Sequence, residues 1–176
     1  MRIGERPRHD GPIVFADYDP DWPARYEQEA ERIRAALGVR ALLLEHAGST
    51  SVPGLAAKPV VDIVLAVSDS SNEDEYVPPL EAVGYELRIR EPDWYEHRML
   101  KKMEPNVQLH VFSAGCVEID RMLAFRDHLR SNDADRELYE RTKRELGAQH
   151  WEYVQDYADA KSEVVEAIIA RAGEVS

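Results

Sequence analysis

Four small residues, Gly48-Ser49-Thr50-Ser51, are the first candidates for chemistry in this chain of 176 residues. They follow an apolar segment of strand character and precede a short helical turn. The free backbone N–H groups and the hydroxyl groups of such a turn can bind a phosphate, and the helix dipole favours the same negative charge. A tight turn in which a serine caps a helix has the same composition. The four residues therefore predict either a phosphate-binding loop or a structural turn.

Two charged residues follow this turn closely. Lys58 precedes Pro59, which restricts the residue before it to an extended backbone, so the lysine stands at the entrance of a strand. It could there neutralise a phosphate or remain in solvent. Asp62 interrupts the apolar run from 59 to 67, where a carboxylate is costly unless it meets a cation, a metal or donors. We expect Asp62 to face a ligand or Mg²⁺; a buried cap or a salt bridge to an arginine is the alternative.

A histidine on a later segment could join them. Alternation along 107–112 places Gln108, His110 and Phe112 on one face of a strand. His110 could ligate a metal, act as a base or bind phosphate, and a lone strand histidine can also be simply hydrogen-bonded.

Cations also occur at core-facing positions of the helical C-terminal third. Arg126 and Lys161 each fall on the apolar stripe of a helical pattern, so each must pair with an acid, possibly Asp62 for Arg126, or face a ligand. Snorkelling explains one such cation, whereas two that converge on the Gly-Ser turn predict an anion pocket. Lys143 forms an i, i+4 pair with Tyr139 and could join that pocket or face solvent.

Bulk composition limits the partners of the chain. The net charge is −12, from 34 acidic and 22 basic residues, which argues against general nucleic-acid binding and leaves room for a local pocket that takes a small phosphorylated ligand or nucleotide. The single cysteine, Cys116, permits neither an internal disulfide nor a thiolate metal cage. No secretory signal and no apolar run of membrane-spanning length is present, so we expect a cytoplasmic protein without membrane contact.

The elements that must position these residues follow from hydrophobic periodicity. We predict a polar, flexible arm over residues 1–12 and a single domain over 13–176. Strands are expected at 40–46, 59–67, 85–90, 96–103 and 107–112, and helices from about 21 to 38, before Gly84, and at 118–130, 133–147 and 151–170. The fold class is α+β: a mixed sheet of about five strands flanked by helices, with a helical C-terminal third.

The segment 45–67 resembles the signature of nucleotidyltransferase-fold enzymes. In that signature an apolar residue, a Gly and a Gly or Ser are followed, about a dozen residues later, by Asp-apolar-Asp/Glu. Here Val64 occupies the position of the second carboxylate. The chain therefore combines a nucleotide- or phosphate-handling motif with an incomplete set of metal-binding acids.

Longer motifs resemble the GrpB family, which also occurs as the C-terminal domain of some bacterial dephospho-CoA kinases. The resemblance covers residues from about 15 to 170. It rests on Trp22-Pro23, Glu45-His-Ala-Gly-Ser-Thr-Ser-Val-Pro-Gly-Leu-Ala-Ala-Lys-Pro-Val-Val-Asp-Ile63, Leu109-His-Val-Phe112, Arg121 with Phe125-Arg-Asp-His-Leu-Arg130, Tyr139 with Lys143, and Tyr157-Ala-Asp-Ala-Lys-Ser162. It implies a nucleotidyltransferase-like fold and brings no established activity. The site positions that it matches are Gly48, Ser49, Lys58, Asp62, His110, Arg121, Arg126, Tyr157 and Lys161.

Three functions are compatible with these residues. The first is an enzyme that transfers a nucleotidyl or phosphoryl group to a small acceptor, with Asp62 on Mg²⁺, Lys58 and the arginines stabilising charge, and His110 as metal ligand or base. The second is a non-catalytic domain that binds a nucleotide or phosphorylated cofactor, for which the valine at position 64 is no obstacle. The third is an internal salt-bridge network of Asp62, Arg126 and Lys161. We favour the enzyme.

Overall fold

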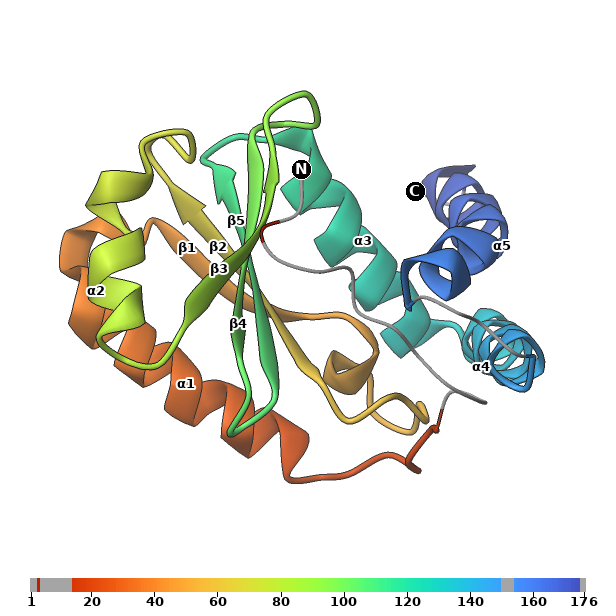
Figure 1. Cartoon of the computed structure of the whole chain (residues 1–176). Helices are drawn as coiled ribbons and strands as arrows, with labels where there is room; N and C mark the ends of the chain where they lie inside the picture. Colours follow the sequence, from red (N-terminus) through yellow and green to blue (C-terminus); the bar gives the residue numbers. More distant parts are fainter. Residues whose placement is uncertain (1–2, 4–13, 150–153, 175–176) are drawn as a thin grey trace.

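The computed structural model describes Ile3 and residues 14–149 and 154–174, and its centre is a mixed sheet of five strands (Figure 1). The strands are β1 (Leu43–Ala47), β2 (Val61–Val67), β3 (Glu86–Glu91), β4 (His97–Lys102) and β5 (Val107–Ser113). Their order in the sheet is β1-β2-β5-β4-β3; β2 and β5 run parallel and every other neighbouring pair is antiparallel. The predicted mixed sheet is thereby confirmed.

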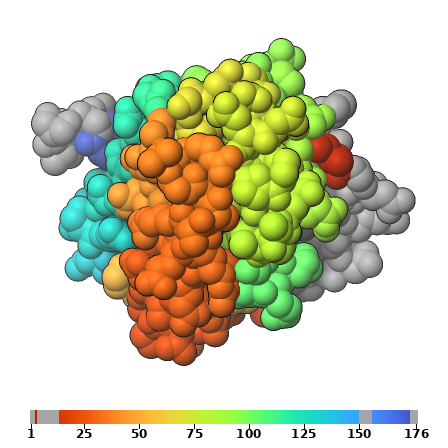
Figure 2. Space-filling view, turned by 90° about the vertical axis from the view of Figure 1, so that its left-hand side faces the viewer, coloured from red at the N-terminus to blue at the C-terminus, as the bar shows by residue number. Residues whose placement is uncertain are grey.

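One face of the sheet is covered by α1 (Trp22–Leu37) and α2 (Val77–Glu81), which lie side by side in Figure 2. Pro23 stands in the first turn of α1, and Gly38, at φ +58°, follows its last residue. The buried stripe of α1 packs on the alternate residues of β2 and β5 that face it, and this cluster forms the main core: Tyr26, Ala30, Ile33, Leu37, Ile63, Leu65, Val67, Val107, Leu109 and Val111.

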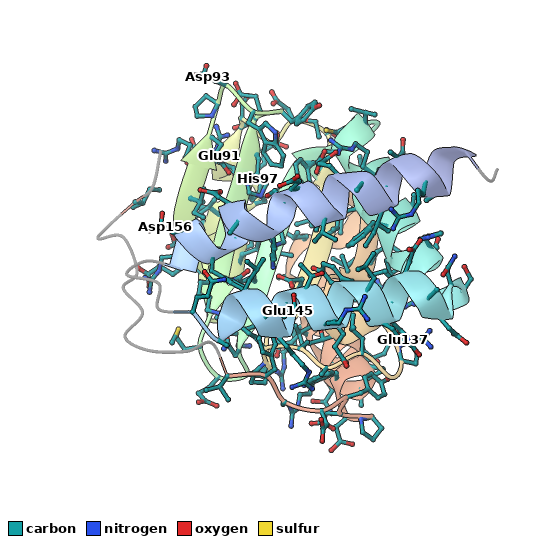
Figure 3. All side chains as sticks on the ribbon, turned by 90° about the vertical axis from the view of Figure 1, so that its right-hand side faces the viewer. Glu91, Asp93, His97, Glu137, Glu145 and Asp156 are labelled. Atoms are coloured by element: carbon teal, nitrogen blue, oxygen red, sulfur yellow. The ribbon has the colours of Figure 1, made fainter. Side chains whose placement is uncertain are left out.

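The opposite face carries α3 (Val117–Ser131), α4 (Asp133–Gly147) and α5 (Val154–Glu174), and Figure 3 shows α4 and α5 side by side across it. Helix α3 closes a small apolar cluster that includes Val64 of β2 and Phe112 of β5. The three helices are linked by Asp135, whose carboxylate accepts hydrogen bonds from His128 and Arg171, each at 2.7 Å. This face therefore holds the residues that were predicted to form a site.

Several boundaries differ from the predicted ones. Strand β1 begins at Leu43 rather than near residue 40, because Gly38–Arg40 forms a 3₁₀ turn, and α2 is only five residues long. The predicted arm at 1–12 lies outside the described residues except for Ile3, whose N–H donates to the Arg88 carbonyl at 2.8 Å. The expected start of the last helix at 151 also lies outside them. Among the helices described, none has the length and apolarity that crossing a membrane requires.

Candidate functional site

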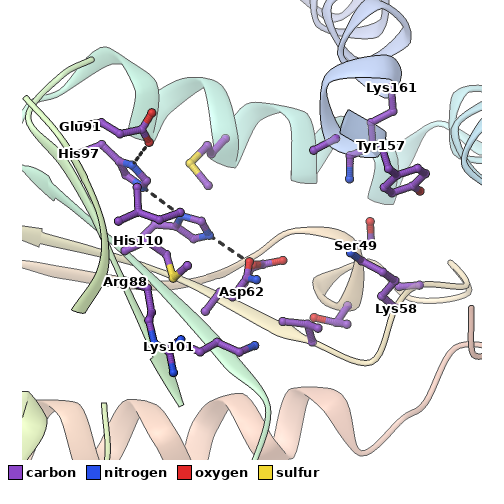
Figure 4. Close-up of a pocket in the computed structure, with 18 of the residues that line it drawn as sticks. Ser49, Lys58, Asp62, Arg88, Glu91, His97, Lys101, His110, Tyr157 and Lys161 are labelled. Carbon is purple, nitrogen blue, oxygen red and sulfur yellow. Dashed lines mark hydrogen bonds and ion pairs between the residues drawn. The ribbon is translucent and has the colours of Figure 1, made fainter. Parts of the chain in front are cut away.

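A cavity of about 760 Å³ lies between the sheet and the three C-terminal helices (Figure 4). Eight of the predicted site residues line it: Ser49, Thr50, Lys58, Asp62, His110, Lys143, Tyr157 and Lys161. They come from the 3₁₀ turn η2 (Ser49–Ser51) and the segment after it, from β2 and β5, and from α4 and α5. Much of the remaining wall is apolar, contributed by Ile89, Trp94, Met99, Met103, Phe112 and Met122.

The Gly-Ser turn lies directly against Asp62. Gly48 has φ +71°, and a Cβ atom built on it would overlap Oδ2 of Asp62 and lie 3.0 Å from its Cβ and Cγ. Glycine is therefore required here both by the backbone conformation and by the close approach of the carboxylate. The antiparallel pairing of Ala47 with Asp62 brings the two segments together. Ser51 turns inward, with its hydroxyl donating to the Gly48 carbonyl, and does not line the cavity.

Three lysines line the cavity near the Gly-Ser turn and Tyr157, and we call Lys58, Lys143 and Lys161 the lysine cluster. Nζ of Lys143 donates to Ser49 Oγ at 2.8 Å and to the Ala56 carbonyl at 3.2 Å, and the residue is only 2% exposed. Nζ of Lys58 and Nζ of Lys161 lie 5.6 and 5.2 Å from the centre of the Tyr157 ring. The ion pairs found within the described part of the chain include one lysine, Lys102, and none of the cluster.

Burial and repulsion by neighbouring lysines lower the pKa of two ammonium groups of the cluster, those of Lys143 and Lys58. Burial, followed by the positive charge of Lys161, lowers the pKa of Lys143 to about 7. The same two causes, in the same order, lower the pKa of Lys58. Lys101, on the other side of Asp62, also has its pKa lowered by burial, and its Nζ donates to the Asn106 side chain. A bound anion would relieve the repulsion that disfavours these charges.

A hydrogen-bonded chain of four side chains leads away from Asp62 along the sheet (Figure 4). Nε2 of His110 lies 3.3 Å from Oδ1 of Asp62, and Nδ1 of His110 lies 3.1 Å from Nε2 of His97. Nδ1 of His97 in turn lies 2.8 Å from Oε1 of Glu91. We call these four residues the imidazole chain. Burial first, then the charges of His110 and Arg98, lower the pKa of His97 to about 3.

Comparison with known proteins agrees with this picture of the fold. The sequence model of the family described as GrpB protein matches residues 12–171. The chain belongs to the GrpB family. A UPF0157 protein of Halalkalibacterium halodurans is 56% identical over 98% of this chain and 88% of its own length. The crystal structure of GrpB from Enterococcus faecalis has a TM-score of 0.77 at 30% identity and covers 90% of this chain and 98% of that one.

Part of the chain is also similar in sequence to a named enzyme. Dephospho-CoA kinase of Mycolicibacterium paratuberculosis is 43% identical to this GrpB protein over 77 residues, which are 42% of this chain and 19% of the kinase. The likeness thus covers only a minor part of the kinase.

Two predicted arginines of this GrpB protein do not reach the cavity. Arg126 donates to the Glu45 carboxylate and to the His46 carbonyl, both at 3.0 Å, and also to Asp127. Arg121 donates to Glu166 at 2.6 Å. The expectation that Arg126 points towards the Gly-Ser turn is therefore corrected: α3 passes over β1, and the acid that Arg126 meets on that strand is Glu45 rather than Asp62.

The residues around Asp62 do not fit a Mg²⁺ ion, which takes oxygen ligands, mostly carboxylates, phosphates and water. Asp62 acts electrostatically on Lys58, Lys101 and Lys143, so its surroundings are already cationic. Within the described ranges, no group of three His, Cys, Asp or Glu side chains is placed to hold a metal. Val64 is completely buried under α3, so the second carboxylate position of the nucleotidyltransferase signature is filled by core.

Two members of the imidazole chain, His97 and Glu91, are not predicted from the sequence. The strand expected at 96–103 contains His97, and alternation places it on the same face as Met99 and Lys101. That signal does not say which face meets His110. The register decides it, because Met99 pairs with His110 and Glu91 pairs with His97.

Proposed function

We propose that this cavity binds a phosphate group of a small phosphorylated ligand, with the lysine cluster as its counter-charge. The observation that carries the proposal is the gathering of three cations in one cavity, one of them hydrogen-bonded to the Ser49 hydroxyl, without a carboxylate ion-pair partner among the described residues. A cation withdrawn from water is costly unless an opposite charge accompanies it. A phosphate in contact with the ammonium groups supplies that charge and forms charge-assisted hydrogen bonds.

The distribution of cations supports the same proposal. The chain has five lysines, and four of them line this cavity, although the net charge of the protein is −12. Arg88 adds a fifth positive group to the lining. Such a local concentration of positive charge attracts anions against the overall negative charge of the molecule.

The shape of the cavity favours a ligand of metabolite size. Its volume of about 760 Å³ falls within the roughly 300–1,000 Å³ that is usual for small-molecule sites. Beyond the lysines, aromatic and thioether side chains such as Trp94, Phe112 and Met122 line the wall. These surfaces suit an organic group attached to the phosphate, for which a nucleoside is one possibility consistent with the nucleotidyltransferase-like signature.

Calorimetric titration of the full chain tests the proposal. The probes are inorganic phosphate, pyrophosphate, ATP and dephospho-CoA, the last chosen because of the partial likeness to dephospho-CoA kinases, each with and without Mg²⁺. At least one phosphorylated probe should bind without metal. Lys161→Met should weaken it about tenfold or more, because a charge-assisted hydrogen bond is worth about 1.5–3 kcal/mol.

The matched control is Arg141→Met. Arg141 is exposed on α4 and lies outside the cavity lining, and its replacement changes the net charge by the same amount as Lys161→Met. The affinity of the Arg141→Met variant for the probe should equal that of the wild type. Absence of binding by every probe, or equal losses in both variants, would contradict the proposed site.

A second function, group transfer to a hydroxyl acceptor, is favoured by the imidazole chain. A binding domain has no need of a carboxylate coupled to two histidines beside its anion site, whereas transfer to a hydroxyl needs a group that accepts the hydroxyl proton. Incubation of the bound phosphorylated probe with simple alcohols, followed by phosphorus NMR, tests for turnover. New phosphate ester signals support transfer; an unchanged spectrum supports binding alone.

A further inference from the structure

The imidazole chain runs along the wall of the cavity, which all four of its members line, from Asp62 to Glu91. The Asp62 and His110 side chains are 26% and 21% exposed, the His97 side chain is 6% exposed, and the Glu91 side chain is 41% exposed. Glu91 is thus the most accessible member, Asp62 and His110 are partly exposed, and His97 alone is buried. Trp94 and Phe112 pack against the His97 ring, which stacks on His110 with centroids 5.4 Å apart, so aromatic side chains flank the bond between the two rings.

The imidazole chain has one more hydrogen bond than it has ring protons when both carboxylates are ionised and both imidazoles are neutral. Three hydrogen bonds connect the four groups, and each requires one proton. Two ionised carboxylates and two neutral imidazoles contribute only two ring protons, so one bond lacks its proton. A single additional proton completes all three bonds. The four groups therefore form one unit that exchanges one proton rather than four independent sites.

The position of the missing proton depends on the tautomers. If both rings carry their proton on Nδ1, the bonds to Glu91 and between the rings are made, and the gap lies between Asp62 and His110 Nε2. If both carry it on Nε2, the gap lies at Glu91 instead. A proton that enters at one end consequently leaves at the other when both rings exchange tautomer.

We propose that Asp62 is the acid–base group towards a hydroxyl of the phosphorylated ligand, and that His110, His97 and Glu91 relay its proton to solvent. This inference rests on the proposed phosphate site. Asp62 is the member that touches the Gly-Ser turn, through Oδ2 beside Gly48, whereas both ring nitrogens of His110 are engaged within the chain. Asp62 is the catalytic group, and the other three are positioning residues.

The proton transfer balances without a further reactant. The ligand O–H bond breaks, its electron pair stays on the oxygen, and the proton joins the Asp62 carboxylate. His110 takes that proton on Nε2 and gives its Nδ1 proton to Nε2 of His97. His97 gives its own Nδ1 proton to Glu91, which releases it to water. The ligand oxygen is left able to attack an electrophilic centre, and the second function requires that step.

The surrounding charges determine when the additional proton is held. The groups that face the chain from the packed elements are Lys58, Lys101, Lys143, Lys161, Arg88, Arg98, His46 and Glu118. Their excess of positive charge opposes the entry of a further proton into the chain. A phosphate on the lysine cluster offsets this charge and makes proton uptake more favourable. Ligand binding and proton uptake are therefore coupled.

Nitrogen NMR of the histidine side chains in the free, full-length protein tests the shared proton directly. His97 and His110 should show one common midpoint in a pH titration, because a single proton serves both rings. Glu91→Gln should move the midpoint of His110, although Glu91 does not touch it. His128, paired with Asp135 outside the cavity, is the internal control and should not respond. Separate midpoints, or a His110 midpoint unchanged by Glu91→Gln, would overturn the relay.

Calorimetry with pyrophosphate tests the link to the ligand. Titrations in two buffers of different ionisation enthalpy give the number of protons taken up on binding. His110→Gln should retain binding and lower that number by up to about one, since the unit exchanges one proton. An unchanged number with intact binding overturns the relay alone. If pyrophosphate does not bind, the same titration is made with a phosphorylated probe that does. Failure of every phosphorylated probe to bind overturns the phosphate site and the ligand-directed role of Asp62, while the NMR midpoints still decide whether the proton is shared.

Discussion

Replacement of Lys143 by methionine provides a quantitative test of the lysine cluster. Lys143 is buried, and its hydrogen bonds to Ser49 and Ala56 go to neutral acceptors. Its pKa falls from an ordinary value of 10.5 to about 7 on folding, with burial as the main cause. Between these two values the unfolded chain binds more protons than the folded protein, so the stability of the wild type rises with pH across that window. The methionine variant lacks this contribution.

The expected size follows from the two pKa values. Integrating the difference in bound protons from about pH 7 to about pH 9.5 gives a gain in wild-type stability of about 3 kcal/mol from Lys143. The variant also loses the two hydrogen bonds of the amine, which costs it about 1–3 kcal/mol at either pH. This loss lowers the free energy of unfolding of the variant by the same amount at both pH values, so it does not affect the difference between them. The free energy of unfolding of Lys143→Met relative to the wild type should therefore fall by about 3 kcal/mol between the two pH values.

Urea denaturation of both proteins at about pH 7 and about pH 9.5 measures this change. Arg141→Met serves as the control, because an exposed arginine on the same helix keeps its charge at both pH values and its replacement should have a pH-independent effect. A relative stability of Lys143→Met that changes by less than about 1 kcal/mol between the two values would refute the reasoning. It would mean that Lys143 is not held as a desolvated cation at neutral pH.

Three further substitutions separate the parts of the site. Gly48→Ala should abolish pyrophosphate binding in calorimetry, because the overlap of its Cβ with Asp62 and the positive φ displace the turn that carries Ser49. Gly54→Ala, also at positive φ but with no atom within 4 Å of the new Cβ, should cost only about 1–2 kcal/mol of stability and keep binding. Asp62→Asn should tighten metal-free pyrophosphate binding roughly threefold to tenfold by removing a like charge; weaker and Mg²⁺-dependent binding would instead support a metal role. Arg126→Met should lower the free energy of unfolding by about 1–3 kcal/mol in urea denaturation, because it removes the hydrogen bonds of the guanidinium group to Glu45 and the His46 carbonyl, and should leave pyrophosphate affinity unchanged.

Features that depend on neighbouring residues could be predicted from the sequence. Alternation along β5 places Leu109 in the main core and His110 in the cavity, as expected, because a strand turns successive side chains to opposite faces. The mixed sheet and the helical C-terminal third also follow from local periodicity. Asp62 lies in the cavity because it is on the face of β2 opposite to Ile63.

Features that depend on how elements pack could not be predicted from the sequence. Periodicity placed Arg126 on the buried side of α3, and its side chain is indeed only 11% exposed. Its partner is 81 positions away in sequence and is fixed by the passage of α3 over β1, about which the helix pattern contains no information. His97 and Glu91 were missed for a similar reason. Their alignment with His110 is set by strand register, and a shift of one residue would turn His97 to the other face.

Val64 connects the departure from the nucleotidyltransferase signature with the imidazole chain. It lies on the same face of β2 as Asp62, two residues further on, and α3 covers it completely. A carboxylate there would be desolvated beneath Ile119 without a cation to accompany it. Its neighbour on the adjacent strand is His110, whose ring instead reaches back to Asp62. The place where the signature has a second acid thus holds apolar core beside an imidazole. This exchange favours proton transfer over metal binding as the chemistry that Asp62 supports.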